Sequence, residues 1–234
     1  MEHKTEGENR AWRGSSYGNS VMHRWLIKIL KVVDTRVIYW ISYIFILPAT
    51  IFKGEFWHIY NFYRKSLQMQ RVASFINSYK NHCMFSQSVI DKFAMYAGKE
   101  FNIEIDGLSY YRELTEKREG FVMLSSHIGN YEIAGYSLKS ENKKMNALVY
   151  LGEKKAIMQN RAKLFGIANI EMIPIKEDMS HLFYLNNSLS QGEIVSIPAD
   201  RIWGSQKYVS VDFFSQKAHL PLGPFSVIAM RGVK

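Results

Sequence analysis

The sequence contains little cysteine and proline, and the shortage of cysteine excludes a class of protein. Among 234 residues there are five prolines and one cysteine, Cys83. One thiol cannot form an intrachain disulfide or a cysteine-based zinc site, so a disulfide scaffold is excluded and a reducing compartment is favoured. Charged residues make up 22% of the chain and hydrophobic residues 47%, which excludes a disordered protein. The composition predicts one globular domain of ordinary size.

Cofactor and metal fingerprints are also missing from the sequence. There is no Gly-x-x-x-x-Gly-Lys phosphate loop and no Gly-x-Gly-x-x-Gly dinucleotide motif. The seven histidines do not cluster with acidic residues in a metal-ligand pattern, so we expect no cofactor and no metal. Neither Ser125 nor Ser126 lies in a Gly-x-Ser-x-Gly elbow, which disfavours a serine hydrolase.

Basic residues outnumber acidic ones by 30 to 21, but the excess is uneven along the chain. Residues 1–100 hold 14 basic and 7 acidic side chains, whereas residues 101–200 hold 11 and 13. The basic excess therefore lies mainly beside the most apolar stretch. This placement favours an anionic membrane surface as the partner, and we expect no nucleic acid.

The N-terminal part combines a polar, an amphipathic and an apolar segment. We expect a flexible polar tail at 1–20 and a membrane-associated helical segment at 21–56. Apolar residues at 22–33 recur at spacings of three and four beside Arg and Lys, which predicts a basic amphipathic helix. Residues 37–52 carry no charge but fall short of the roughly 20 residues of a full span, and Pro48 interrupts them. We expect a membrane anchor or an in-plane hairpin, with a buried core helix as the alternative.

Residues 57–234 show the pattern of an α/β domain. After a helical region at 57–97 that ends near Gly98, apolar runs alternate with helical segments of about 10–15 residues. This alternation predicts a mostly parallel sheet covered by helices on both faces. The expected strands lie at 101–106, 120–125, 145–150, 170–175, 193–197 and 208–214, and the expected helices near 130–140, 153–166, 178–190 and 224–231. Because the chain stops where the pattern would start its next strand, we expect the C-terminal part of the domain to be missing.

The segment FVMLSSHIGNYEIAG, residues 121–135, carries the candidate chemistry. A buried strand delivers His127 to its C-terminal end, where open α/β sheets place their ligand sites. Gly129 and Asn130 then turn the chain into a helix with Glu132 in its first turn. Across such a turn the Glu132 carboxylate can hold one nitrogen of His127 and leave the other as a base. The alternatives are a structural histidine and a glutamate that complements a helix N-terminus.

The block SSHIGNYEIAG resembles the one that defines the lysophospholipid acyltransferase-like superfamily, in which His-x4-Asp or Glu is the catalytic pair. It is most similar to the lipid A biosynthesis late acyltransferases. Two departures are Tyr131, where Trp is common, and Ser215, where Gly often follows two Phe residues. Further blocks resemble the same family in chain order: AWRGSSYGNSVMHRWLIKILKVVDTRVIYWIS at 11–42, IDKFAMYAG at 90–98, IPADRIWG at 197–204 and VDFFSQKAHLPLGPFSVIAMRG at 211–232.

The resemblance implies an acyltransferase-like fold and an enzyme that moves an acyl group from a thioester to a hydroxyl. His127 and Glu132 are then the catalytic residues, and we assign substrate binding to Asn130, Asp200, Arg201 and Gly223. Arg201 offers a forked donor suited to phosphate oxygens, although Asp200 and Arg201 also fit a surface ion pair. The turn around Gly223 either lies beside the acyl channel or is only a turn.

The resemblance also implies an acyl carrier protein as donor, a lipid A-type glycolipid precursor as acceptor, and the cell inner membrane with the active site facing the cytoplasm. Two alternatives stay open at this point. One is a related acyltransferase with an aryl-polyene or phospholipid-like acceptor, or with an acyl-CoA donor. The other is a non-catalytic membrane-interaction protein of the same fold.

Overall fold

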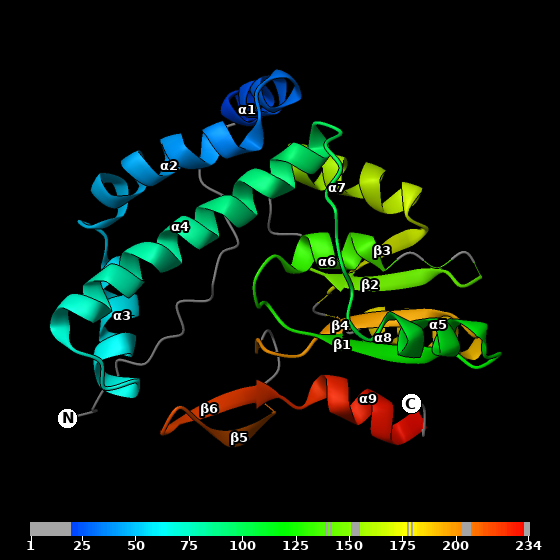
Figure 1. Cartoon of the computed structure of the whole chain (residues 1–234). Coiled ribbons are helices and arrows are strands. Elements are labelled where there is room, and N and C mark those ends of the chain that lie inside the picture. Colours follow the sequence, from blue (N-terminus) through cyan, green and yellow to red (C-terminus); the bar gives the residue numbers. More distant parts are fainter. Residues whose placement is uncertain are drawn as a thin grey trace.

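The central sheet contains four parallel strands in the order β1-β4-β2-β3 (Figure 1). In the computed structural model, residues 20–231 are described apart from 139, 141, 151–154, 177, 179 and 203–206. The strands are β1 (Phe121–Ser125), β2 (Met145–Val149), β3 (Ile170–Pro174) and β4 (Ile194–Pro198). β4 comes last along the chain but lies between β1 and β2. All four strands were predicted, and parallel pairing places their carboxyl ends at one edge of the sheet.

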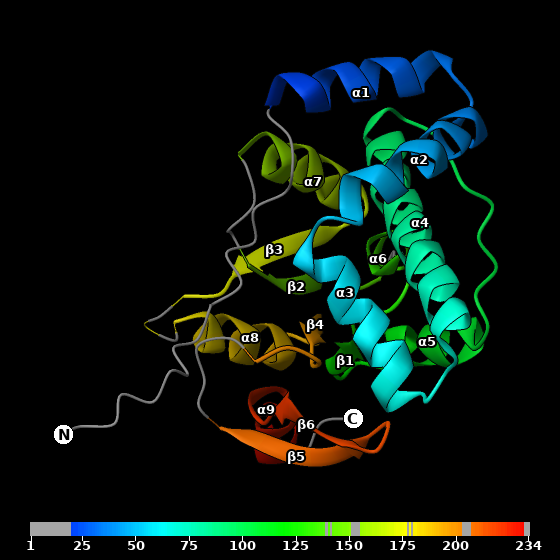
Figure 2. The same cartoon turned by 90° about the vertical axis from the view of Figure 1, so that its left-hand side faces the viewer.

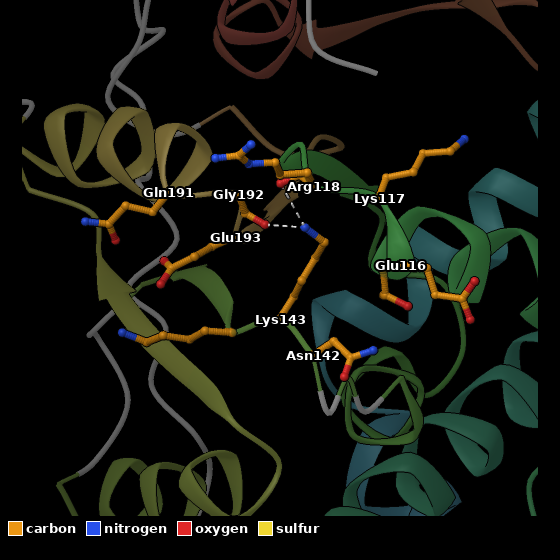
Figure 3. Close-up of a pocket in the computed structure, with 10 residues that line it drawn as sticks. Glu116, Lys117, Arg118, Asn142, Lys143, Gln191, Gly192 and Glu193 are labelled. Carbon is orange, nitrogen blue, oxygen red and sulfur yellow. Dashed lines mark hydrogen bonds between the residues drawn. The ribbon is translucent and has the colours of Figure 1, made fainter.

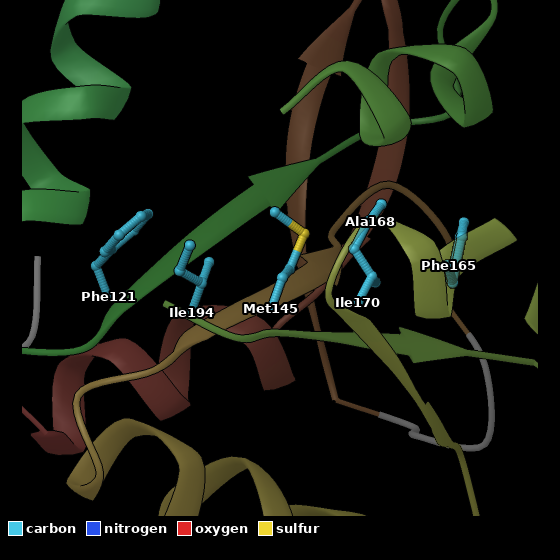
Figure 4. Close-up of a cluster of buried hydrophobic side chains, with 6 residues drawn as sticks. All are labelled: Phe121, Met145, Phe165, Ala168, Ile170 and Ile194. Atoms are coloured by element: carbon cyan, nitrogen blue, oxygen red, sulfur yellow. The ribbon is translucent and has the colours of Figure 1, made fainter. Parts of the chain in front are cut away.

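Helices cover both faces of this sheet, as the alternating pattern predicted (Figure 2). One face packs against α5 (Leu108–Glu116), α6 (Tyr131–Ser137) and α7 (Lys155–Ile167), and the other against α8 (His181–Ser190) and α9 (Gly223–Arg231). Strand residues alternate between the two cores, because successive side chains point to opposite faces. Phe121, Met145 and Ile170 lie in the first core, which Figure 4 shows, whereas Val195 and Ile197 lie in the second.

The predicted strand at 101–106 is wrong. Residues 99–105 form no regular element, and Phe101 packs against the helical core around Phe93 instead. Alternating hydrophobicity is not sufficient for a strand, which also needs neighbouring backbone groups to pair with. Residues 101–106 have no strand partner in the part of the chain that the structure describes.

The strand expected at 208–214 exists but does not join the parallel sheet. It is β5 (Tyr208–Phe213), which pairs antiparallel with β6 (Gln216–Pro221) in a separate hairpin. The tip of this hairpin contacts η1 (Phe62–Ser66), a short π-helical turn. The rings of Phe62 and Phe214 lie 5.6 Å apart, and Gln216 Nε2 donates to Ser66 Oγ at 2.7 Å.

The N-terminal part is a layer of helices stacked beside the sheet (Figure 1). Its elements are α1 (Ser20–Val32), α2 (Thr35–Thr50), α3 (Gly54–Asn61), η1 and α4 (Arg71–Tyr96). α4 lies between α2 and the sheet, and Leu30, Phe93 and Ile157 join α1, α4 and α7 in one buried cluster. The helical region expected at 57–97 breaks near Leu67, but its end at Gly98 is as predicted, with φ +87°. Residues 1–19 of the expected tail lie outside the described residues.

The apolar segment at 37–52 forms α2, which contains no fully buried residue. Val37, Trp40, Ile41, Ile44 and Phe45 are all exposed, and their spacing places them in one stripe along the helix. No described helix by itself has the length and apolar composition to span a membrane. Only α2 taken together with Gly54–Ser66, across a bend of 95°, has them.

Candidate active site

His127 and Asp200 meet because β1 and β4 are neighbours. Ser125 at the end of β1 pairs in register with Pro198 at the end of β4, so the residues two positions further along emerge side by side. His127 Nδ1 lies 2.8 Å from Asp200 Oδ1, and the His127 backbone N–H donates to Asp200 Oδ2 at 2.9 Å. Each carboxylate oxygen therefore receives one hydrogen bond, and the imidazole is fixed in both position and rotation.

The partners of Asp200 also fix the protonation pattern of the His127 ring. Burial raises the pKa of Asp200, but the hydrogen bonds from the ring and backbone of His127 outweigh it and hold the pKa below its usual range. Because an ionised carboxylate only accepts, Nδ1 must carry the shared proton. No side chain in the described part of the protein bonds Nε2, while the ring of Tyr131 packs edge-on at 4.6 Å. Nε2 therefore has a lone pair suited to a general base.

The predicted hydrogen bond between His127 and Glu132 is not formed among the described residues. Glu132 lies on the buried face of α6 and is only 8% exposed. Arg161 Nε donates to its Oε1 at 2.9 Å, and Lys92 Nζ lies 3.1 Å from its Oε2. Tyr96 on α4 also donates to Oε1, at 3.1 Å. The carboxylate therefore joins α6 to α4 and α7, and Asp200 holds the position beside the ring that we predicted for Glu132. A catalytic role for Glu132 stays a prediction.

Arg161 and Lys92 keep the Glu132 carboxylate ionised. Burial alone raises its pKa, but the positive charges of Arg161 and Lys92, with their hydrogen bonds, outweigh this and hold the pKa below its usual range. Burial and the nearby Glu132 charge raise the pKa of the Tyr96 phenol, so Tyr96 stays a neutral donor. The cluster is a buried ionised network directly behind the turn that carries His127.

That turn depends on Gly129 and Asn130. Gly129 adopts φ +60°, a left-handed conformation that side chains disfavour. Asn130 follows as the N-cap of α6, and its Oδ1 accepts from the Ile133 backbone N–H at 3.4 Å. Its Nδ2 donates to Asp91 on α4 at 3.1 Å. In this structure the side chain of Asn130 thus holds the turn, while its predicted contact with substrate stays a prediction.

Arg201 and Gly223, the other predicted binding residues, are both exposed. Arg201 directly follows Asp200, whose carboxylate bonds His127, and its predicted contact with the acceptor stays a prediction. Gly223 begins α9 after the β5–β6 hairpin. No hydrogen bond or ion pair of the described residues joins Gly223 to His127, and its role beside an acyl chain stays a prediction.

Sequence reasoning missed four buried or half-buried polar residues behind the site. Three of them lie in the block at 90–98 that resembles the family, but neither that block nor helical periodicity reveals what they contact. They are Asp91, Lys92, Tyr96 and Arg161.

A polar hollow lies at the opposite edge of the sheet (Figure 3). It measures about 500 Å³ and is lined by polar residues that precede the strands, among them Arg118, Lys143 and Glu193. Lys143 Nζ donates to the backbone carbonyls of Gly192 at 2.6 Å, Glu119 at 3.1 Å and Arg118 at 3.4 Å. This ammonium group therefore connects the loop of Lys143 itself with the loops at 118–119 and 192. The hollow contains none of the candidate catalytic residues, because in parallel sheets these gather at the carboxyl ends.

The described residues contain no group of three or more His, Cys, Asp or Glu side chains placed to hold a metal ion. His127 and Asp200 stand as a pair, and the Glu132 carboxylate is paired with Lys92 and Arg161. With Nε2 as the base, the His127–Asp200 pair is chemically suited to removing a proton from a hydroxyl.

A comparison with known families decides the class of protein. The family model described as bacterial lipid A biosynthesis acyltransferase matches residues 81–231, more than half of the chain. The chain belongs to this family. The acyltransferase resemblance is therefore confirmed, and the enzyme transfers acyl groups. No curated protein sequence matches the chain significantly. The matched region contains the whole parallel sheet, His127 and Asp200 of this acyltransferase.

Proposed function

We propose that this acyltransferase moves a fatty acyl chain from an acyl carrier protein thioester to a hydroxyl of a lipid A-type glycolipid precursor. The observation that supports this most is the His127–Asp200 pair at the carboxyl edge of the sheet. It is a base with an orienting carboxylate, and no nucleophilic side chain is needed for direct transfer. Membership of the lipid A acyltransferase family supports the acceptor class.

The proposed reaction proceeds in one direct transfer. His127 Nε2 removes the proton of the acceptor hydroxyl while the oxygen attacks the thioester carbonyl carbon. A C–O bond forms, the C–S bond breaks, and the leaving thiolate takes up the proton held by His127. Asp200 stabilises the imidazolium, since its carboxylate already accepts from Nδ1. Such a positioned base typically contributes ~10²–10⁴-fold to the rate.

Arg201 is the proposed contact for an acceptor phosphate. Arg201 follows Asp200 directly in the chain and is exposed, which supports a contact with an acceptor bound at His127. A guanidinium donates a fork of N–H groups that matches phosphate oxygens. This supports a phosphorylated glycolipid over a neutral acceptor such as an aryl-polyene precursor.

We propose that α1 and α2 attach the enzyme to the cytoplasmic leaflet of the inner membrane. Trp25 on α1 is 61% exposed, and Trp40 and Ile44 on α2 are each 70% exposed. Soluble proteins rarely leave such apolar stripes open to water. Exposed Arg and Lys residues adjoin them, and Lys28 Nζ lies 5.3 Å from the Trp25 ring centre. Aromatic and basic residues together suit an anionic headgroup layer.

Mass spectrometry of cell lipids tests the proposed reaction. Lipids are compared between cells lacking the gene, cells carrying the wild-type gene and cells carrying His127→Ala at equal protein abundance. We expect one glycolipid to gain the mass of an acyl chain only with the wild type. The mass difference identifies acyl length, and fragmentation identifies the acceptor. Acylation of a phospholipid or an aryl-polyene instead would replace the proposed acceptor, and normal acylation by His127→Ala would remove the proposed base.

The membrane proposal has its own test in fractionation. The substitutions Trp40→Ser, Ile44→Ser and Phe45→Ser, made together, remove exposed apolar side chains without touching the face of α2 that packs on α4. We expect them to move the protein from the membrane fraction to the soluble fraction. If α2 lies in the membrane plane, high salt should release part of the wild type from the membrane fraction. If α2 is inserted, the wild type should stay in the membrane fraction in alkaline carbonate. A wild-type chain that fractionates as soluble at low salt would contradict the proposal.

A further inference from the structure

Asp91 on α4 forms hydrogen bonds to two different parts of the protein, helix α2 and the turn after β1. Tyr39 on α2 donates its hydroxyl to Asp91 Oδ1. Asn130, at the turn after β1, donates Nδ2 to Asp91 Oδ2 at 3.1 Å. The carboxylate thus uses one oxygen for the N-terminal helices and the other for the turn that carries His127.

The side-chain amide of Asn130 can serve this contact in only one orientation. Its Oδ1 already accepts the Ile133 backbone N–H, so Nδ2 must face Asp91. Reversing the amide would set donors against the backbone N–H and an acceptor against a carboxylate. Asp91 therefore selects the orientation in which Asn130 caps α6 and closes the turn at Gly129.

α4 holds this turn through two successive residues. Asp91 bonds Asn130, and Lys92 Nζ lies 3.1 Å from the Glu132 carboxylate. His127 lies three residues before Asn130, and its own contacts to Asp200 fix only its ring and backbone N–H. At the far end of the turn, the Asn130 side chain is bonded by Asp91 of α4, while Glu132 is bonded from both α4 and α7. A catalytic group displaced by about 1 Å can lose ~10² in rate, so this support matters for catalysis.

We infer that Asp91 is a positioning residue for acyl transfer, which holds the turn carrying His127 through Asn130 and couples that turn to α2 through Tyr39. The inference rests on the proposed function for its kinetic consequences. The described hydrogen bonds of Asp91 go to Tyr39 and Asn130 and not to His127, so we infer that it acts on the reaction through the turn. Because α2 also presents Trp40 and Ile44 on its exposed side, the carboxylate connects that exposed surface with the catalytic base.

The kinetic test compares Asp91→Asn, Tyr39→Phe and Ser42→Ala in the full-length enzyme. Asparagine offers one acceptor oxygen instead of two, so its NH₂ must face either Tyr39 or Asn130. We expect kcat of Asp91→Asn to fall ~10-fold and that of Tyr39→Phe ~3-fold, with KM for donor and acceptor within twofold. Ser42→Ala is the matched control, because Ser42 Oγ contacts Ser86 Oγ at 3.1 Å in the same α2–α4 interface without reaching the turn. It should keep wild-type kcat.

A measurement without substrate separates this inference from the proposed function. Hydrogen–deuterium exchange reports whether the amides of residues 127–133 open more often. We expect faster exchange there in Asp91→Asn and Tyr39→Phe, unchanged exchange in Ser42→Ala, and partial recovery in Asp91→Glu, which restores the second oxygen. This result stands even if the wild type proves inactive with the chosen substrates, an outcome that would overturn the proposed function alone.

Three outcomes would overturn the inference. The first is wild-type kcat and wild-type exchange in Asp91→Asn. The second is an equal loss in Ser42→Ala, which would show a general weakening of the α2–α4 interface. The third is a change in KM at constant kcat, since positioning of the base acts on the chemical step. Tyr39→Phe keeps the test decisive if Asp91→Asn folds poorly, because it removes a single hydroxyl.

Discussion

Asp200→Asn tests the catalytic geometry most directly. His127 gives two hydrogen bonds to two different oxygens of Asp200, one from Nδ1 and one from its backbone N–H. Asparagine has one carbonyl oxygen, so its NH₂ must face one of these donors. If it faces the backbone, one charged hydrogen bond worth ~1.5–3 kcal/mol is lost, or about one to two decades in rate.

The other orientation of the asparagine costs more. An NH₂ facing the ring forces Nδ1 to accept, which moves the ring proton to Nε2 and removes the base. The equivalent change in a serine protease lowers kcat ~10⁴-fold. We therefore expect Asp200→Asn to lower kcat by ~10²–10⁴-fold. Because the Asp200 side chain is 27% exposed, we expect only a small change in the free energy of unfolding.

Steady-state transfer from an acyl carrier thioester to glycolipid, with thermal unfolding measured alongside, provides the assay. Asp212→Asn is a suitable control, since it also removes a carboxylate charge from an ion pair, that with Lys217 at 2.7 Å on the exposed hairpin. It should keep wild-type kcat. A kcat for Asp200→Asn within about threefold of the wild type would refute the assignment of Asp200 as the residue that orients His127.

Three further predictions concern binding and stability. Arg201→Ala should raise KM for the acceptor ~10–10²-fold and leave KM for the donor unchanged, and Arg201→Lys should recover part of the loss. Steady-state kinetics that give both KM values within twofold of wild type would argue against the phosphate contact. Glu132→Gln should lower the free energy of unfolding by ~3–5 kcal/mol, because Arg161 and Lys92 lose their buried counter-charge. The folded state holds the Glu132 pKa below its ordinary 4.5, so the Glu132 charge contributes its full stability above pH 4.5 and loses it as the pH falls through the folded pKa. Urea unfolding at neutral and acid pH should therefore show the unfolding free energies of wild type and Glu132→Gln converging in acid. Lys143→Met should lower the free energy of unfolding by about 3 kcal/mol, because three backbone carbonyls lose their donor, and it should keep wild-type kcat. Denaturation and kinetics measure the two quantities, and an unchanged unfolding free energy would contradict the stabilising role of Lys143.

The sequence predicted the positions of the helices and strands well, but it did not predict which strands and side chains lie next to one another. Apolar runs located all four parallel strands, and the position after the first run identified His127. The order β1-β4-β2-β3 is a property of the whole fold, and no local pattern contains it. For this reason the partner of His127 was sought five residues away, at Glu132, although it comes from Asp200, 73 residues further along.

Other differences have the same physical origin. β6 follows a turn in which Phe214 and Ser215 both adopt positive φ, a conformation that hairpins usually reserve for Gly or Asn, so the turn carries no recognisable signal. The contacts of Asp91 and Arg161 depend on how α4 and α7 pack around α6. Helical periodicity indicates which residues face a core, but not which charged groups will meet inside it.

The late arrival of β4 between β1 and β2 also governs when the enzyme can become active. Until residues 194–198 are synthesised and inserted, β1 has no hydrogen-bonding neighbour among the described strands, and β2 pairs only with β3. The β2–β3 pair can form first, but β1 joins the sheet only through β4, the last of the four strands to be made, and such non-local pairing slows folding. The carboxylate of Asp200 enters with that strand. A nascent chain that already carries His127 therefore lacks the carboxylate that orients the ring, and the proposed catalytic pair is assembled only when β4 joins β1.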